Sequence, residues 1–167
     1  MNAYYTNWVD KTLFNNFQDA DGNQFFANIP GLNSVHQGVE LEFNSNLIGG
    51  LYLNGQVSVG DWAWQNDVDA FISDDNNIIV DTVNVYVADV KVGDAAQLSG
   101  SLTVGYRFDF GLTVDIDGFY YDQLYARFDP AGRQSEALSG VQALQLPSYM
   151  LFNGGLGYQR EIGEVTA

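Results

Sequence analysis

The sequence predicts an all-β fold, arranged as an antiparallel up-and-down meander. Three observations support this prediction: hydrophobic and polar residues alternate in six separate runs, aromatic residues and glycine are abundant, and short turns alternate with long polar segments. The 167 residues include ten tyrosines, eleven phenylalanines, three tryptophans and eighteen glycines. This length is enough for one domain with its own core. Hydrophobicity with a period of two is typical of a strand that has one face in apolar surroundings.

Each of the six runs is rich in strand-forming residues and ends at turn-forming ones. Most are about 9 to 13 residues long, whereas a strand of a soluble protein has about 5–6 residues and a tilted strand needs about 9–11 to cross a bilayer. The runs are Ala3–Thr12, His36–Asn44, Leu51–Trp62, Gln97–Phe108, Leu112–Leu124 and Ser148–Gln159. Their length therefore favours strands that span a membrane.

The connections between the runs alternate in length. Asn46–Gly50 and Asp109–Gly111 are short turns, whereas Leu13–Val35, Ala63–Ala96 and Tyr125–Pro147 are long and polar. Such long structureless loops are uncommon in compact soluble domains, and transmembrane barrels combine short periplasmic turns with long extracellular loops. We therefore expect the meander to be part of a transmembrane outer-membrane β-barrel.

The middle long segment contains a stretch with its own alternation. Asn84–Val92 reads "NVYVADVKV", which predicts a further strand. The strongly polar "DDNN" of residues 74–77 stands shortly before it. We expect this strand to lie above the membrane.

The apolar face of each run has two possible environments. A soluble antiparallel sheet with one solvated face gives the same alternation, whereas an outer-membrane barrel turns its apolar face to lipid. Strand length, loop asymmetry and the aromatic residues near the strand ends favour the barrel, because such rings gather at membrane interfaces. The residues expected to face lipid are Leu51, Leu53, Val57, Leu102, Val104, Leu112, Val114, Ile116 and Phe152.

Composition excludes several classes of function. The net charge is −15 with only six basic residues, which argues against a nucleic-acid partner. Cysteine is absent, which excludes disulfides and a thiol nucleophile. His36 is the single histidine, so the chain cannot form a multi-histidine metal site, and we expect a structural role for it.

Acidic residues recur at short spacings, but none forms a convincing chemical site. Asp19, Asp21 and Asn23 resemble the start of a calcium loop, yet Gly22 comes too early and a polar turn is expected. The pairs Asp115 and Asp117, and Glu40 and Glu42, are expected to line a wet lumen. We therefore predict no catalytic residue, no metal, no cofactor and no enzymatic activity.

Aromatic residues on the external side are the candidates for ligand contact. Trp62, Trp64 and Tyr86 are placed to stack on a sugar or an aromatic chelate if they point into a vestibule. The alternative is that the tryptophans only anchor the outer interface of the membrane.

Several stretches occur in an order that resembles a known family. In sequence they are "NAYYTNWVDKT", "GLNSVHQGVELEF", "LNGQVSVGDWAWQNDV", "VYVADVKVGDAAQ", "GFYYDQLYARFDP" and "LPSYMLFNGGLGYQ". The chain resembles the C-terminal part of the barrel of TonB-dependent outer-membrane receptors, most closely those of Bacteroidetes-type bacteria. The likeness covers nearly the whole chain, from about Ala3 to Gln159, and "HQGVELEF" and "GDWAWQNDV" are its most specific parts.

The resemblance implies a location, a function and partners. Receptors of this family have a barrel of about 22 strands around an N-terminal plug and sit in the bacterial outer membrane. They import iron–siderophore chelates, cobalamin or glycans with energy from the TonB complex, which engages the N-terminal part of the receptor. The implied partners are outer-membrane lipid, the remainder of the receptor and the TonB complex.

The same resemblance implies that residues 1–167 are a segment of a larger receptor. Six strands cannot close such a barrel, and the sequence shows no plug, no signal peptide and no final strands after "REIGEVTA". A different class remains open, namely a soluble β-sandwich or adhesin-like binding module whose apolar faces form a core. A passive porin is a third possibility.

Overall fold

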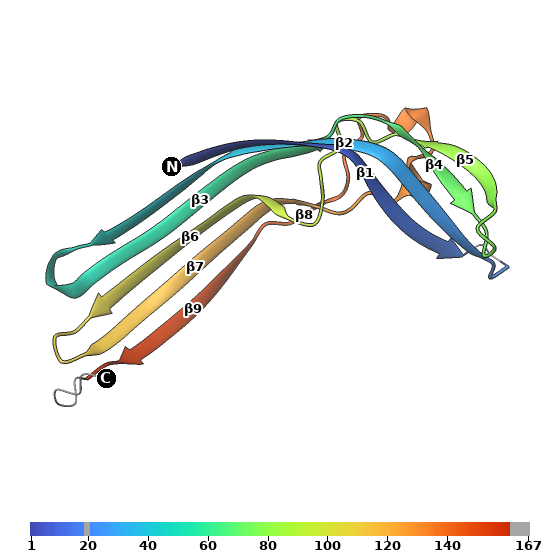
Figure 1. The fold of residues 1–167 in the computed structure, drawn as a ribbon. Coiled ribbons are helices and arrows are strands. Elements are labelled where there is room, and N and C mark those ends of the chain that lie inside the picture. Colours follow the sequence, from blue (N-terminus) through green and yellow to red (C-terminus); the bar gives the residue numbers. More distant parts are fainter. Residues whose placement is uncertain (19–20, 161–167) are drawn as a thin grey trace, which may run out of the picture.

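The computed structural model describes residues 1–18 and 21–160 and has one antiparallel sheet of nine strands (Figure 1). The only helical segments among these residues are three short 3-10 turns, η1 (Ile48–Gly50), η2 (Pro130–Arg133) and η3 (Glu136–Leu138). The strands are β1 (Asn2–Gln18), β2 (Gln24–Asn46), β3 (Leu51–Trp64), β4 (Val68–Ser73), β5 (Ile79–Val85), β6 (Ala96–Arg107), β7 (Leu112–Tyr125), β8 (Gln145–Leu146) and β9 (Tyr149–Tyr158). The predicted all-β antiparallel fold is confirmed.

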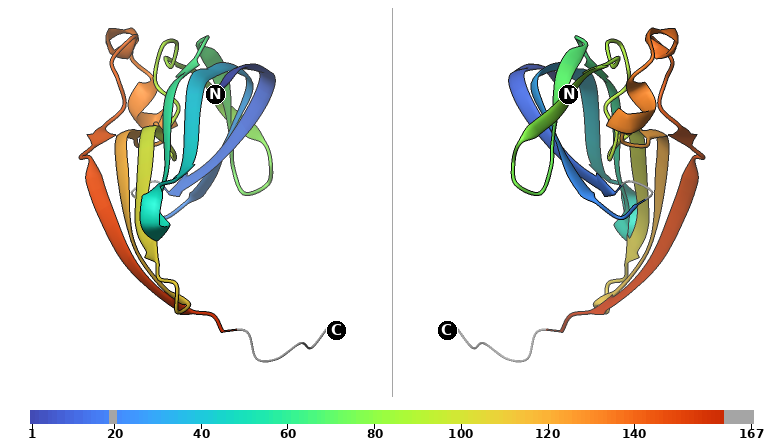
Figure 2. Two further views of the ribbon diagram at one scale, coloured as in Figure 1. Left: turned by 90° about the vertical axis from the view of Figure 1, so that its left-hand side faces the viewer. Right: turned by 90° about the vertical axis from the view of Figure 1, so that its right-hand side faces the viewer.

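The principal strands follow one another as a meander. Their order across the sheet is β1, β2, β3, β6, β7 and β9, and each pair is antiparallel. These six strands match the six predicted runs. The sheet is curved and open, because β1 and β9 lie at opposite edges and do not pair with each other (Figure 2).

The two predicted short turns are confirmed at one end of the sheet. Gly49 and Gly50 have φ angles of 73° and 90° in the β2–β3 turn, and Gly111 has a φ of 96° in the β6–β7 turn. A Cβ atom at Gly50 would lie 2.1 Å from the main-chain oxygen of Arg107. Only glycine therefore fits the β2–β3 turn at this position.

Two of the three long segments predicted as loops form paired strands, so the prediction is wrong for them, whereas the third is irregular apart from short turns and a two-residue strand. β1 continues to Gln18 and β2 begins at Gln24, so these two strands form a hairpin through most of the first segment. The second segment contains the β4–β5 hairpin, and the third contains η2, η3 and β8. Asp19, part of the expected polar turn, lies outside the described residues.

The strand predicted at Asn84–Val92 is also not formed as expected. β5 ends at Val85, and beyond it only an isolated bridge between Ala63 and Lys91 remains. The chain leaves the sheet because the Asp67 carboxylate accepts hydrogen bonds from the main-chain N–H groups of Val87 and Ala88, at 2.6 and 2.8 Å.

The long segments fold together into what we call the head, made of residues 10–18, 21–33, 64–95 and 126–147. The remaining strand residues, which lie in 1–9, 34–63, 96–125 and 149–158, are called the long sheet. Asp10 and Gly31 mark the boundary with φ angles of 59° and 79°, and the β1–β2 register shifts there. In Figure 1 the long sheet extends to the left and the head lies to the right.

The hydrophobic core of the protein lies in the head. β4 pairs with the N-terminal part of β2, β5 pairs with β4, and residues from the segments after β5 and β7 complete the core. Ile29, Leu32 and Val85 have no exposed surface. The full core consists of Ala27, Ile29, Leu32, Trp64, Val68, Ala70, Ile72, Val85, Val87, Val90 and Phe128.

Candidate functional site

The long sheet has one continuous apolar face. The register pairs Leu53 with Val104, Val104 with Ile116, and Gly118 with Phe152, so these side chains project from the same side. All nine residues that were expected to face lipid share this side: Leu51, Leu53, Val57, Leu102, Val104, Leu112, Val114, Ile116 and Phe152. We call this surface the apolar face.

The apolar face forms a band to which four strands contribute spans of equal length. It runs over Leu51–Val59, Leu98–Tyr106, Leu112–Tyr120 and Met150–Tyr158, with every second residue on the face. Each span covers eight residue steps, which is about 26 Å along a strand. None of the band's face positions carries Asp, Glu, Lys or Arg.

No described part of the chain covers the apolar face. Phe152 is 71% exposed, Ile116 61% and Leu156 82%. Contiguous apolar surface of this kind is rare on soluble monomers and marks contact with a partner or a membrane. Among the described residues, no helix is both long enough and apolar enough to cross a membrane.

Aromatic and polar residues border the band at its two ends. Near the short turns, Tyr106 lies 4.7 Å from Phe108 and Phe108 lies 5.3 Å from Phe110, measured between ring centroids. Near the head, Asp61 occupies the next position on this face of β3 after Val59, where the band ends, and forms an ion pair with Lys91. The band therefore changes from apolar to charged within one step of the alternation.

The opposite side of the long sheet, called the polar face, is held by cross-strand hydrogen bonds. The Tyr52 hydroxyl donates to Asp115 at 3.2 Å, and the Thr103 hydroxyl donates to Asp117 at 2.6 Å. The Arg107 guanidinium lies 4.1 Å from the centre of the Tyr52 ring. Asp115 and Asp117 thus accept cross-strand hydrogen bonds on the polar face.

The polar face continues into the hydrophobic core of the head. In β3, Trp62 and Trp64 project from the same side, and their partners in β2 are His36 and Ser34. Trp62 is half-buried on the polar face, whereas Trp64 is 5% exposed in the core. One side of the sheet is thus polar in the long sheet and apolar in the head.

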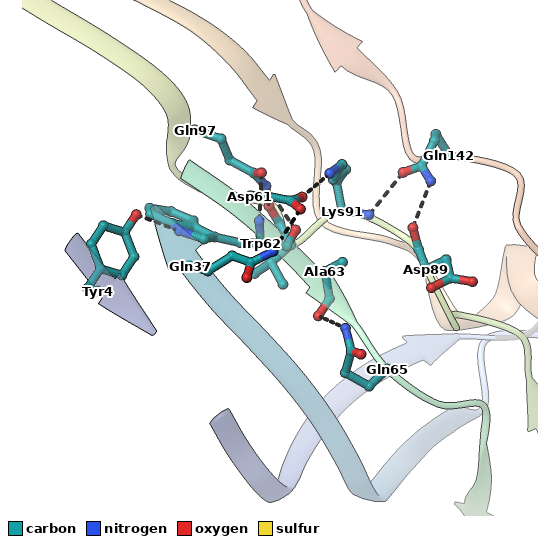
Figure 3. A network of polar contacts seen from close by, with 11 residues as sticks. Tyr4, Gln37, Asp61, Trp62, Ala63, Gln65, Asp89, Lys91, Gln97 and Gln142 are labelled. Carbon is teal, nitrogen blue, oxygen red and sulfur yellow. Dashed lines mark hydrogen bonds and ion pairs between the residues drawn. The ribbon is translucent and has the colours of Figure 1, made fainter. Parts of the chain in front are cut away.

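A network of polar contacts joins the head to the long sheet (Figure 3). Gln97, only 2% exposed, accepts a hydrogen bond from the Trp62 main-chain N–H at 2.9 Å and donates to the oxygens of Trp62 and Val92, both at 3.1 Å. The Gln142 side chain accepts from the Lys91 N–H at 2.9 Å and donates to the Asp89 oxygen at 2.8 Å. Nothing in the sequence marked these two glutamines among the other polar residues.

Two titratable groups at this junction have shifted pKa values. Hydrogen bonds from Lys91 and Gln37 lower the pKa of Asp61, and partial burial opposes them. Burial lowers the pKa of His36, and the charge of Lys11 lowers it further. His36 stacks on Trp62 with ring centroids 5.2 Å apart and shares a hydrogen bond of 3.3 Å with the Ser34 hydroxyl. These contacts give His36 a structural role.

The structure does not bring the three ligand-binding candidates together. Trp64 lies in the core against Phe128, with ring centroids 5.8 Å apart, so it is available neither for ligand stacking nor for anchoring at an interface. Tyr86 lies in the head, where its main-chain N–H donates to the Arg133 oxygen at 2.9 Å. Trp62 alone reaches the polar face.

The described residues contain no group of three or more histidine, aspartate or glutamate side chains placed to hold a metal ion. Comparison with protein-family models, with curated proteins and with solved structures finds no match to this chain.

Proposed function

We propose that this chain is part of the wall of an outer-membrane TonB-dependent receptor, with its apolar face against lipid and its polar face toward the lumen. In this proposal the head is part of the extracellular region. The short turns at Ile48–Gly50 and Asp109–Gly111 lie in the periplasm, as short turns of such barrels do.

The observation that carries the proposal is the uncovered apolar band. Its span of about 26 Å along each strand corresponds to a height of about 20 Å if the strands are tilted by about 40°, close to the ≈ 25 Å apolar band of outer-membrane barrels. The band lacks charged side chains and has an aromatic cluster at its lower border. These are the features of a lipid-facing barrel surface.

The open edges of the sheet support the same proposal. β1 in the long sheet and β9 each pair on one side only. In lipid, unpaired main-chain groups cost several kcal/mol each, so spanning strands exist only in closed barrels. The chain therefore needs neighbouring strands, which the remainder of the receptor would supply.

The proposed activity and partners follow from the resemblance alone. The receptor would take up a scarce nutrient such as an iron–siderophore chelate, cobalamin or a glycan. Its energy would come from the TonB complex, acting through an N-terminal part outside this chain. The segment itself would provide barrel wall and external structure, without catalysis or a cofactor.

A test is possible without any background labelling, because the chain has no cysteine. Single cysteines carrying a nitroxide would be placed in the full chain at Val57, Leu102 and Ile116 and at their neighbours Gln56, Ser101 and Asp117. The protein would be refolded into lipid vesicles at a concentration at which copies pair at their open edges, because one copy cannot close a barrel. Collisions with oxygen report lipid, and collisions with a water-soluble nickel chelate report water. We expect the first three positions to favour oxygen and the second three to favour nickel.

The alternative, a soluble β-sandwich or adhesin-like module, makes the opposite prediction. A sandwich needs a second layer on the apolar face, and no described residue provides one. A chain that stays monomeric without detergent, with Leu102 and Ile116 shielded from both reagents, would contradict the barrel and support that module.

A further inference from the structure

A hollow on the polar face lies beside the junction with the head and has a volume of about 620 Å³. We propose that this hollow, bounded by Tyr4, Trp62, Glu40 and Glu42, binds a linear organic polycation, with one ammonium group over the Trp62 ring and the others against the two carboxylates. The role of this site in uptake rests on the proposed function, but binding itself does not.

Two glycines on the polar face make room for the aromatic residues that line the hollow. Gly38 in β2 pairs with Gly60 in β3 and with Tyr4 in β1. A Cβ atom at Gly38 would come within 2.5 Å of the Tyr4 hydroxyl, and one at Gly60 would come within 2.8 Å of the Trp62 indole nitrogen. Replacing either glycine would therefore displace Tyr4 or Trp62, which both line the hollow.

Trp62, two residues beyond Gly60 in β3, is held in one orientation (Figure 3). Its indole N–H donates to the Tyr4 hydroxyl at 2.9 Å, its ring stacks on His36, and Gln97 fixes its main chain. The same ring lines the hollow. An indole ring that is already immobilised offers a cation–π surface without further loss of side-chain freedom.

The charge of the hollow favours a cationic ligand. Glu40 and Glu42 are both exposed and both line it, and their two negative charges exceed the single positive charge of the Met1 amino group, which also lines it. Both carboxylates accept hydrogen bonds from neutral side-chain amides, Glu40 from Asn2 and Glu42 from Asn44, each at 3.3 Å. The chain as a whole carries a net charge of −15, which adds to the attraction of cations.

The spacing of these groups favours several charges on one extended molecule. The Trp62 indole lies over Gly60, because a Cβ atom there would be 2.8 Å from its ring nitrogen, and Gly60 faces Gly38 in β2. Gly38 is two residues from Glu40 and four from Glu42. At about 3.3 Å per residue, these separations are about 7 and 13 Å along the strand. An extended molecule with amino groups several ångströms apart can reach the ring and a carboxylate together, whereas a single ammonium ion cannot.

Calorimetric titration with spermidine would test the proposal. The full chain would be held in a non-ionic polyoxyethylene detergent at 0.15 M salt. We expect the paired variant Glu40→Gln/Glu42→Gln to bind at least about tenfold more weakly, because charge-assisted hydrogen bonds are lost while the side-chain shapes remain. Trp62→Ala should also weaken binding by about tenfold. Trp62→Phe, which keeps a ring against His36, should retain part of the affinity.

The matched control is Asp115→Asn/Asp117→Asn, which removes the same charge elsewhere on the polar face and should change the affinity less than twofold. Equal losses in the two paired variants would show that spermidine follows total charge, and would overturn the site. Absence of spermidine binding would do the same. So would binding of a neutral glucose oligosaccharide that needs Trp62 but ignores Glu40 and Glu42. The nitroxide experiment gives its answer independently, so failure of the barrel and failure of this site are distinguishable.

Discussion

The head and the long sheet share strands, but their apolar side chains are buried in the head and exposed in the long sheet. In the head, apolar side chains such as Ile29 and Leu32 are fully buried. In the long sheet, Ile116 and Leu156 are largely exposed. The head covers its own apolar side chains, whereas no described residue covers the apolar face of the long sheet.

The environment on one side of the sheet changes from polar to apolar within a few residues. Trp62 and Trp64 project from the same side of β3, yet the first meets polar groups and the second enters the core. The comparison shows that the alternation of apolar and polar residues along a strand does not by itself determine which side of the strand is buried. That depends on what covers that stretch of strand, and here the segments 86–95 and 126–147 cover only the head.

The largest expected effect is in the head core. Trp64→Ala should lower the free energy of unfolding by about 3–5 kcal/mol, since a buried aromatic side chain leaves a cavity. Phe152→Ala, at an exposed position of the apolar face, should cost far less. Denaturant unfolding in detergent would measure both. Equal losses would show that a second layer buries Phe152.

A charge on the apolar face should have the next largest effect. Leu102→Lys is expected to cost about 2–4 kcal/mol in lipid vesicles if the site is near the bilayer midplane. Ser101→Lys, one residue away on the polar face, should change stability by less than about 0.5 kcal/mol. Reversible unfolding from vesicles gives both values, and similar costs for the two lysines would remove the distinction between the faces.

The junction between the two regions should be sensitive to Gln97. Gln97→Leu leaves the N–H and oxygen of Trp62 without their buried partner and should cost about 1–3 kcal/mol. Gln65→Leu is the control, because Gln65 is exposed and its side chain makes one hydrogen bond, to the Ala63 oxygen at 3.0 Å. A Gln97→Leu variant as stable as the control would mean that water replaces the lost carboxamide.

The smallest expected effect is a pH dependence at the same junction. His36 has a folded-state pKa below its ordinary value of 6.5, so above that pH it is neutral in both states and has no effect. As the pH falls below 6.5, the unfolded chain binds the proton first, and stability decreases until the folded-state pKa is reached. Thermal midpoints between pH 7 and 5 should fall less for His36→Gln. If the midpoints of the wild type and of His36→Gln fell equally with pH, the pH dependence would come from other groups.

Sequence patterns were sufficient for the long sheet. The alternation located most ends of the six principal strands to within a few residues. The positive-φ glycines Gly50 and Gly111 lie in the two predicted turns, which join β2 to β3 and β6 to β7. The alternation also placed nine apolar residues on one face, because the period of two relates every second residue without knowledge of the partner strand.

The same patterns failed in the head for a physical reason. β4 and the inner half of β2 are short or interrupted by Gly31, and their apolar residues are recognisable only once distant segments cover them. Asn84–Val92 alternates like a strand, yet the Asp67 carboxylate binds its main chain and ends the strand at Val85. Trp64 was predicted at a surface because nothing local distinguishes it from Trp62.

The open edge at β9 has a consequence for how a neighbouring strand is chosen. Tyr149–Tyr158 presents unpaired main-chain groups that accept any antiparallel strand of suitable length. A slip of two residues preserves the facing of the incoming side chains, but a slip of one residue turns all of them to the wrong side. The contrast between the two faces therefore selects against pairings that are shifted by an odd number of residues. Main-chain hydrogen bonding alone does not make this selection.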